Sequence, residues 1–120
     1  NIRLQCEQQL KGKLIRIRQA YLEVGLHRKG MDALLKESLN SLFPAFRGML
    51  RLKTKLNPPT DKEEIITALS DSFSIDSRVF LEIFRDKKND NKINSQDVEP
   101  FFEKYVAGLE KLAIASDQIQ

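Results

Sequence analysis

The sequence predicts an all-α fold, an antiparallel helical bundle of about five helices, three of them long and two short. Three observations predict it. Apolar residues recur at helical spacing along most of the 120 residues, no stretch shows strand-like alternation, and proline and polar clusters separate five segments. Short connections favour antiparallel neighbours. We therefore expect residues 1–120 to form a single helical-bundle domain.

The two long segments that come first are each predicted from one apolar stripe. Over residues 4–24 the stripe has helical spacing and is widened by Ile15 and Leu22, and Gly25 is expected to end the helix. Over residues 31–55 the pattern repeats, but Pro44 interrupts it and predicts a kink or break near residues 41–43. The stripes contain Leu10, Leu14, Ile17 and Tyr21, then Leu35, Leu39, Leu42, Phe46 and Met49.

The turn signals divide the rest of the chain. Pro58 and Pro59 cannot continue a helix, and Thr60 with Glu63 has the spacing of a capping box that opens a short helix over 61–73. A second short helix is expected over 78–86, capped by Asp76 or Ser77, and a polar loop over 87–94. A last long helix should begin near Ser95 or Asp97, because Pro100 is tolerated near a helix start.

Ten apolar or aromatic residues are predicted for the core because they repeat on the inner side of these segments. They are Leu14, Tyr21, Leu39, Leu42, Phe46, Leu69, Phe80, Phe102, Tyr105 and Leu109.

The composition is that of a globular domain, with 41% apolar and 31% charged residues. No apolar run approaches the roughly 18 residues that a membrane span requires, and no secretory signal precedes the first helix, so we expect no membrane partner. Cys6 is the only cysteine, which fits a reducing, cytoplasmic compartment. Since helix-like sequence follows Asn1 directly, we expect the chain to be a fragment of a longer protein.

No residue set predicts catalysis. The only histidine, His27, falls in an expected turn beside Arg28 and Lys29, where a solvent-facing role is the simpler interpretation. The five glycines are scattered and form no phosphate-binding loop. We therefore predict that this chain is not an enzyme by itself and has no catalytic residue, cofactor or metal ion.

Residues 86–97 have some features of a calcium-binding loop. Lys88, however, occupies the third position, where an oxygen ligand is needed, and Asn91 replaces the glycine of the sixth. Asp97 at the twelfth position is shorter than the usual glutamate. We therefore predict a polar loop with a helix cap and no useful calcium affinity.

Charge is distributed unevenly along the chain. Residues 1–55 hold 12 Lys or Arg against 4 acidic residues, and residues 56–120 hold 8 against 13. Such a split can mark a surface for a partner, although a solvated face on each half explains it as simply. We predict a docking or phosphate-binding surface made of Lys11, Arg16, Arg18, Arg47 and Arg51. No aromatic residues are interleaved to stack on bases, so support for nucleotide or nucleic-acid phosphate is weak.

Taken together, several patterns resemble the C-terminal helical domain of bacterial proteins whose N-terminal half is similar to a polymerase-beta-type nucleotidyltransferase. Related bundles are substrate-binding or HEPN-like partners of small nucleotidyltransferases. The resemblance rests on helix-face patterns over most of the chain, namely Glu7 to Leu22, Glu37 to Leu39, Phe46 to Leu52, the Pro58 and Pro59 turn, and Phe101, Phe102, Tyr105 and Leu109.

The resemblance implies a four- or five-helix bundle beside a catalytic domain. The catalytic Gly-Ser turn and Asp-x-Asp/Glu pair of nucleotidyltransferases have no match here, and Arg18 lies too far before His27 for the HEPN ribonuclease motif. The expected function is therefore a non-catalytic accessory domain that docks against, or shapes the substrate cleft of, an upstream catalytic domain. An independent protein-interaction or dimerisation bundle is the alternative, in which an apolar patch meets its copy. A calcium-responsive or nucleic-acid-binding module is a third reading.

Overall fold

The computed structural model describes residues 2–24, 28–89 and 98–119. This part of the chain contains five α-helices and no strand, so the predicted all-α bundle of three long and two short helices is confirmed. The helices are α1 (Ile2–Val24), α2 (Arg28–Thr54), α3 (Lys62–Phe73), α4 (Arg78–Asn89) and α5 (Val98–Gln118).

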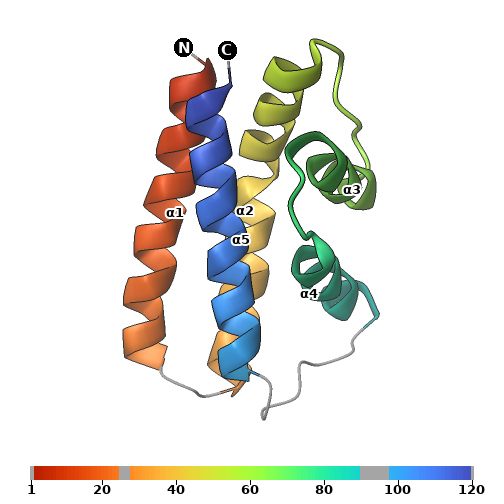
Figure 1. Ribbon diagram of the computed structural model, residues 1–120. Coiled ribbons are helices and arrows are strands. Elements are labelled where there is room, and N and C mark those ends of the chain that lie inside the picture. Colours follow the sequence, from red (N-terminus) through yellow and green to blue (C-terminus); the bar gives the residue numbers. More distant parts are fainter. Residues whose placement is uncertain (1, 25–27, 90–97, 120) are drawn as a thin grey trace.

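The three long helices lie side by side, and α1 runs antiparallel to both of its neighbours (Figure 1). Helices α2 and α5 therefore point in the same direction, and α1 begins at the end of the bundle where α2 and α5 finish. The short helices α3 and α4 pack against α2 and each other, and α4 also reaches α5. The molecule measures 40 × 28 × 20 Å.

Contacts between three aromatic rings hold α4 against α2 and α5. The ring of Phe80 on α4 lies 6.0 Å from that of Phe46 on α2 and meets Tyr105 on α5 edge-on at 5.6 Å. All three side chains are fully buried. Such aromatic pairs add roughly 0.5–1.5 kcal/mol to the burial of their surface. These contacts explain how a helix of only three turns holds a defined place.

Nine of the ten residues predicted for the core are buried, so the prediction is confirmed at those nine positions. Tyr21 is the exception, since it is half-buried and stacks on Phe102 with ring centres 4.5 Å apart. The prediction that Ile15 and Leu22 widen the α1 stripe is wrong, because they are 58% and 82% exposed. Both lie on the outer side of α1, away from its buried face.

Helix α2 continues through Pro44, so the predicted break does not occur. Pro44 faces solvent, whereas Phe43, Ala45 and Phe46 around it are buried. A proline removes one backbone hydrogen bond. Packing of the neighbouring residues on both sides of Pro44 accounts for the survival of the helix.

The caps of the short helices differ in detail from the prediction. The cap of α3 is Asp61, not Thr60, and its carboxylate accepts a hydrogen bond from the Glu64 amide at 3.1 Å. At α4 the carboxylate of Asp76 accepts from the Arg78 amide at 3.0 Å, as predicted for this cap region. The helix runs on to Asn89 instead of ending at residue 86, so the start of the predicted polar loop is helical.

Candidate interaction site

Two of the five predicted surface cations, Lys11 and Arg18, lie on the side of α1 that faces α5. Arg18 forms an ion pair with Glu110 of α5. Lys11 donates to Glu7 at 2.5 Å and lies 3.8 Å from Asp117 of α5. Their charges are therefore matched within the molecule by carboxylates of the other half of the sequence.

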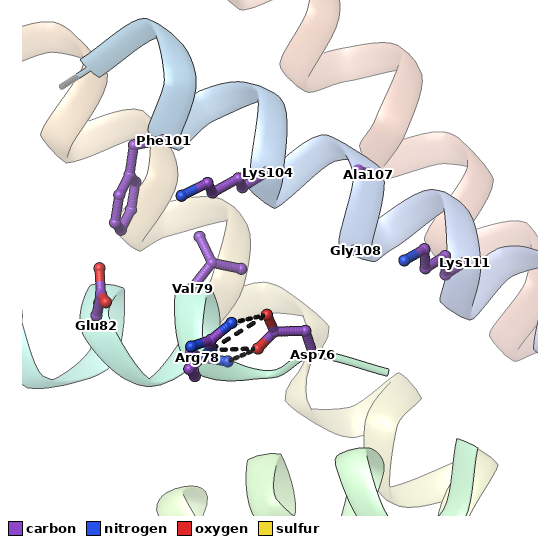
Figure 2. Close-up of a pocket in the computed structure, with 9 residues that line it drawn as sticks. All are labelled: Asp76, Arg78, Val79, Glu82, Phe101, Lys104, Ala107, Gly108 and Lys111. Atoms are coloured by element: carbon purple, nitrogen blue, oxygen red, sulfur yellow. Dashed lines mark hydrogen bonds and ion pairs between the residues drawn. The ribbon is translucent and has the colours of Figure 1, made fainter. Parts of the chain in front are cut away.

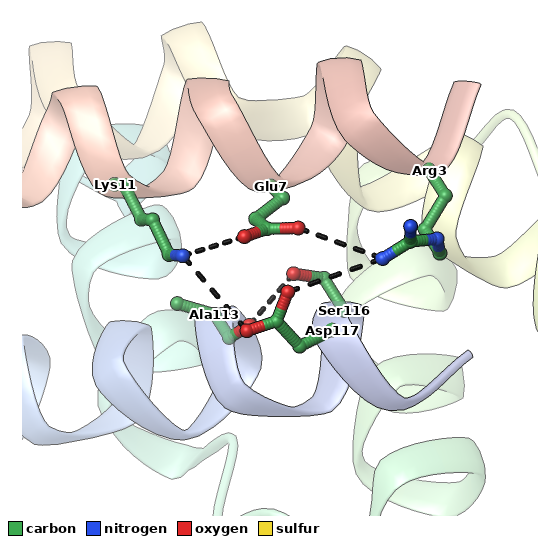
Figure 3. Close-up of polar contacts among 6 residues, drawn as sticks. All are labelled: Arg3, Glu7, Lys11, Ala113, Ser116 and Asp117. Carbon is green, nitrogen blue, oxygen red and sulfur yellow. Dashed lines mark hydrogen bonds and ion pairs between the residues drawn. The ribbon is translucent and has the colours of Figure 1, made fainter. Parts of the chain in front are cut away.

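The pairing around Lys11 forms a closed group of four charges (Figure 3). Arg3 lies 3.6 Å from Glu7 and 3.9 Å from Asp117, so each carboxylate has a cation on either side. The hydrogen bond from Lys11 lowers the pKa of Glu7, whereas a hydrogen bond with Glu7 raises the pKa of Asp117. The protonation of each carboxyl thus depends on the other at the contact of α1 with α5.

Exposed apolar side chains lie between these ion pairs. Because α1 and α5 are antiparallel, the Lys11–Asp117 and Arg18–Glu110 pairs set their register, which places Ile15 and Ile114 at one level between them. Ile15 is 58% and Ile114 is 60% exposed. We call this strip the α1–α5 seam, and it consists of Lys11, Ile15, Arg18 and Leu22 of α1 and Glu110, Ile114 and Asp117 of α5.

The other exposed apolar residues lie in the first turn of α1 and just after α2, and both of these points are at the same end of the bundle. Ile2 is 48%, Leu4 45% and Leu56 70% exposed. Arg51 and Lys53 in the last turn of α2 bring positive charge to the same end. We call these five residues the terminal surface. All six large apolar residues that are exposed in the described chain belong either to it or to the seam.

The other predicted cations are placed elsewhere. Arg16 lines a groove of about 230 Å³ between α1 and α2, beside Lys13 and opposite Glu37. Arg47 lies on the outer side of α2 and donates to the Pro59 carbonyl at 3.3 Å, which holds the connection to α3. Arg51 lies one turn further along α2. The five cations are thus divided among three places: Lys11 and Arg18 lie in the seam, Arg16 lies in this groove, and Arg47 and Arg51 lie one turn apart on the outer side of α2.

A larger cleft of about 350 Å³ lies between α4 and α5 (Figure 2). Arg78 donates two hydrogen bonds to the carboxylate of Asp76, from Nε at 3.0 Å and from Nη2 at 2.7 Å. These bonds lower the pKa of Asp76 to about 2. Lys104 and Lys111 project from α5, and Glu82 lines the cleft from α4. The cleft therefore holds charges of both signs.

The other residues considered from the sequence are His27, the calcium-like segment and Cys6. His27 and residues 90–97 lie outside the described residues, so the expected absence of calcium affinity stays a prediction. Over the ranges that the structure covers, no group of three or more His, Cys, Asp or Glu side chains could hold a metal ion. Cys6 is buried against α2, and burial raises the pKa of its thiol.

Comparison of the chain with protein-family models, with curated proteins and with solved structures finds no match. Of the helices in the described ranges, none has both the length and the apolar content that crossing a bilayer would require.

Proposed function

We propose that this chain is a non-catalytic helical accessory domain of a nucleotidyltransferase-like protein, and that it docks against the catalytic domain of that protein through the terminal surface. The observation that carries the proposal is that Ile2, Leu4 and Leu56 are exposed at the end of the bundle where α1 begins and α2 finishes, the same end that carries Arg51 and Lys53. Exposed apolar residues ringed by charge are typical of surfaces that bind another protein. The resemblance described above supplies the identity of the partner.

The position of the first helix supports the same assignment. A catalytic domain joined ahead of Asn1 would leave the bundle at the end where α1 begins, which is the end that carries the terminal surface. Contact there would bury the apolar group and bring Arg51 to the partner. A short connection raises the effective concentration of the two surfaces, so that even a small contact area can hold them together.

The test uses the longer natural protein and compares its hydrogen exchange with that of the 120-residue chain. We expect the amides in the first turn of α1 and the last turns of α2 to exchange more slowly in the longer protein. A Leu56→Glu and Arg51→Glu double variant should abolish this protection and weaken binding of a nucleotide substrate. Ile114→Glu on the seam is the matched control, because it places the same charge on a different surface.

Equal exchange at the terminal surface in both proteins would refute docking there. Because Arg51 would act through charge, the protection should also weaken as salt shortens the screening length below about 8 Å. Reversal of Arg16, Arg18 and Arg47 to Glu tests the wider basic surface predicted from the sequence. If that triple variant changes neither docking nor nucleotide binding, those three cations contribute to neither.

A separate observation favours a second candidate function, that of a dimerisation bundle. The α1–α5 seam reaches the start of α1 through Asp117, which lies 3.9 Å from Arg3, but its exposed apolar centre, Ile15 and Ile114, lies further along the helices. A catalytic domain docked at the terminal surface would leave this centre uncovered. The seam can therefore serve a different partner at the same time.

A further inference from the structure

We infer that the α1–α5 seam binds a second copy of this chain, with a two-fold axis parallel to the helices, so that α1 of each copy packs against α5 of the other. This inference does not depend on docking at the terminal surface. Three properties of the seam support it: the spacing of its exposed residues, the order of its charges and its size.

The spacing is that of a helix–helix contact. Lys11, Ile15, Arg18 and Leu22 follow one another at intervals of four, three and four residues, which is the repeat of a packed helical seam. The buried stripe of α1 lies on another side and is already used within the bundle, so this is a second repeat on the same helix. In the dimer Ile15 and Ile114 of both copies would form a central apolar layer, with Leu22 packed nearer the end.

The charges select the orientation. Along the seam α1 carries the cations Lys11 and Arg18, and α5 carries the carboxylates Asp117 and Glu110 at the same two levels. A two-fold axis parallel to the helices places α1 opposite the α5 of the partner, so each cation gains a second carboxylate. An axis perpendicular to the helices would place Lys11 opposite the partner's Arg18, which is repulsive. The surface is thus complementary to itself in one orientation only.

The same orientation gives favourable helix directions. Each α1 would lie between its own α5 and the α5 of the partner, and both are antiparallel to it. The contact would therefore be a four-helix arrangement with alternating directions, the most regular form of helical packing. Both terminal surfaces would lie at the same end of the dimer, free to bind other domains.

The size of the face that contains the seam predicts a reversible dimer. The whole outer face of α1 and α5, which extends beyond the seam, measures about 30 × 18 Å, or about 540 Å² on each copy. The total, about 1,100 Å², lies at the lower limit for specific protein interfaces. We therefore expect a dissociation constant in the micromolar range, not a permanent assembly.

Sedimentation equilibrium of the 120-residue chain from about 1 µM to about 1 mM tests the inference. We expect a monomer–dimer equilibrium, and we expect Ile15→Glu or Ile114→Glu to raise the dissociation constant at least about ten-fold, since each buries a charge at the apolar centre. Leu56→Glu is the matched control on the terminal surface and should leave the dissociation constant unchanged. Circular dichroism checks that each variant folds, and Ile15→Ser replaces any glutamate variant that does not.

Charge exchange then tests whether the seam charges hold the dimer, and spin labels test the orientation. A Lys11→Glu and Arg18→Glu variant and a Glu110→Lys and Asp117→Lys variant should each be monomeric and should pair when mixed. Labels at Gln5→Cys, in a Cys6→Ala background, should lie at one level across the interface, whereas a perpendicular axis would separate them by about 28 Å along the helices. A chain that stays monomeric to about 1 mM, a dimer that Ile15→Glu leaves intact, or the larger separation would each overturn the inference.

Discussion

The hydroxyl of Tyr105 on α5 lies 2.8 Å from that of Ser38 on α2, in a hydrogen bond across the core. Both side chains are buried, and Tyr105 is fully so. Each hydroxyl supplies the partner that the other cannot find in water, and a buried polar group without a partner is costly. This bond therefore fixes the relative register of two helices that otherwise meet through apolar contacts.

A double-mutant cycle measures this bond. Tyr105→Phe and Ser38→Ala should each lower the free energy of unfolding by about 1–3 kcal/mol, because each leaves a buried hydroxyl unpaired. The double variant should lose less than the two single losses combined. Urea unfolding of the four proteins is the measurement. Additive losses would mean that the two hydroxyls do not interact.

Alkaline pH should weaken the fold through the same residue. Burial raises the pKa of Tyr105 above its ordinary value of 10.0. The unfolded chain then releases this proton more readily than the folded one, so stability is full below pH 10 and falls as pH rises beyond it. Thermal unfolding between pH 8 and pH 11, at about one-unit steps, should show a smaller decline for Tyr105→Phe than for the natural chain. Equal declines would contradict the assignment.

The centre of the core should be sensitive to a cavity. Leu42 on α2 is fully buried, so Leu42→Ala should lower the free energy of unfolding by about 2–5 kcal/mol. Leu22→Ala removes the same atoms from a side chain that is 82% exposed and should change stability by no more than about 0.5 kcal/mol. Chemical unfolding of both variants is the test. Similar losses in the two would show that Leu22 is buried in solution.

Two glycines should respond to alanine in opposite ways. A Cβ added at Gly48 of α2 would lie 2.7 Å from the Cys6 sulfur, so Gly48→Ala should cost about 1–3 kcal/mol. A Cβ at Gly12 of α1 meets nothing within 4 Å, so Gly12→Ala should gain up to about 1 kcal/mol of helix stability. Melting temperatures report both changes. Cys6→Ala should recover part of the Gly48→Ala loss, and the absence of any recovery would place the strain elsewhere.

Acid should weaken the start of α4. The bonds from Arg78 lower the pKa of Asp76 from 3.8 to about 2, so the folded chain holds this carboxylate charged where the unfolded chain protonates it. The stability that Asp76 contributes is therefore present above pH 3.8 and is lost as pH falls through about 2. Asp76→Asn should be less stable than the natural chain at pH 7 and equal to it below pH 2, by thermal unfolding. A constant difference at all pH values would argue against this linkage.

The sequence predicted the helices well because each one carries its own period of apolar residues. Its errors occur at single positions. Thr60 and Asp61 are both good caps, and only the path of the chain after Pro59 decides between them. Pro44 predicted a break, but Phe43, Ala45 and Phe46 are held by packing on either side. Such outcomes depend on neighbours that are distant in sequence.

The candidate surfaces were harder to predict. Because they are apolar, Ile15 and Leu22 are predicted to widen the apolar stripe of the first helix, but the structure leaves both exposed. The sequence predicts one basic surface that joins Lys11 and Arg18 to Arg16, Arg47 and Arg51. Their partners on α5 are distant in the chain, since Glu110 follows Arg18 by 92 residues and Asp117 follows Lys11 by 106, so no local pattern could reveal these contacts between helices.

By itself, the sequence determined the fold class, the number of helices and nine of the ten residues it predicted for the core, since helical periodicity and burial of apolar residues act over a few turns. The tertiary structure alone decided which outer residues lie together. A helix has several exposed sides, and the sequence does not say which of them a neighbour covers. The antiparallel packing of α1 on α5 alone brings the two halves of the seam together, because contact between distant segments is set by the global packing of the core. These halves are Lys11, Ile15 and Arg18 of α1 and Glu110, Ile114 and Asp117 of α5.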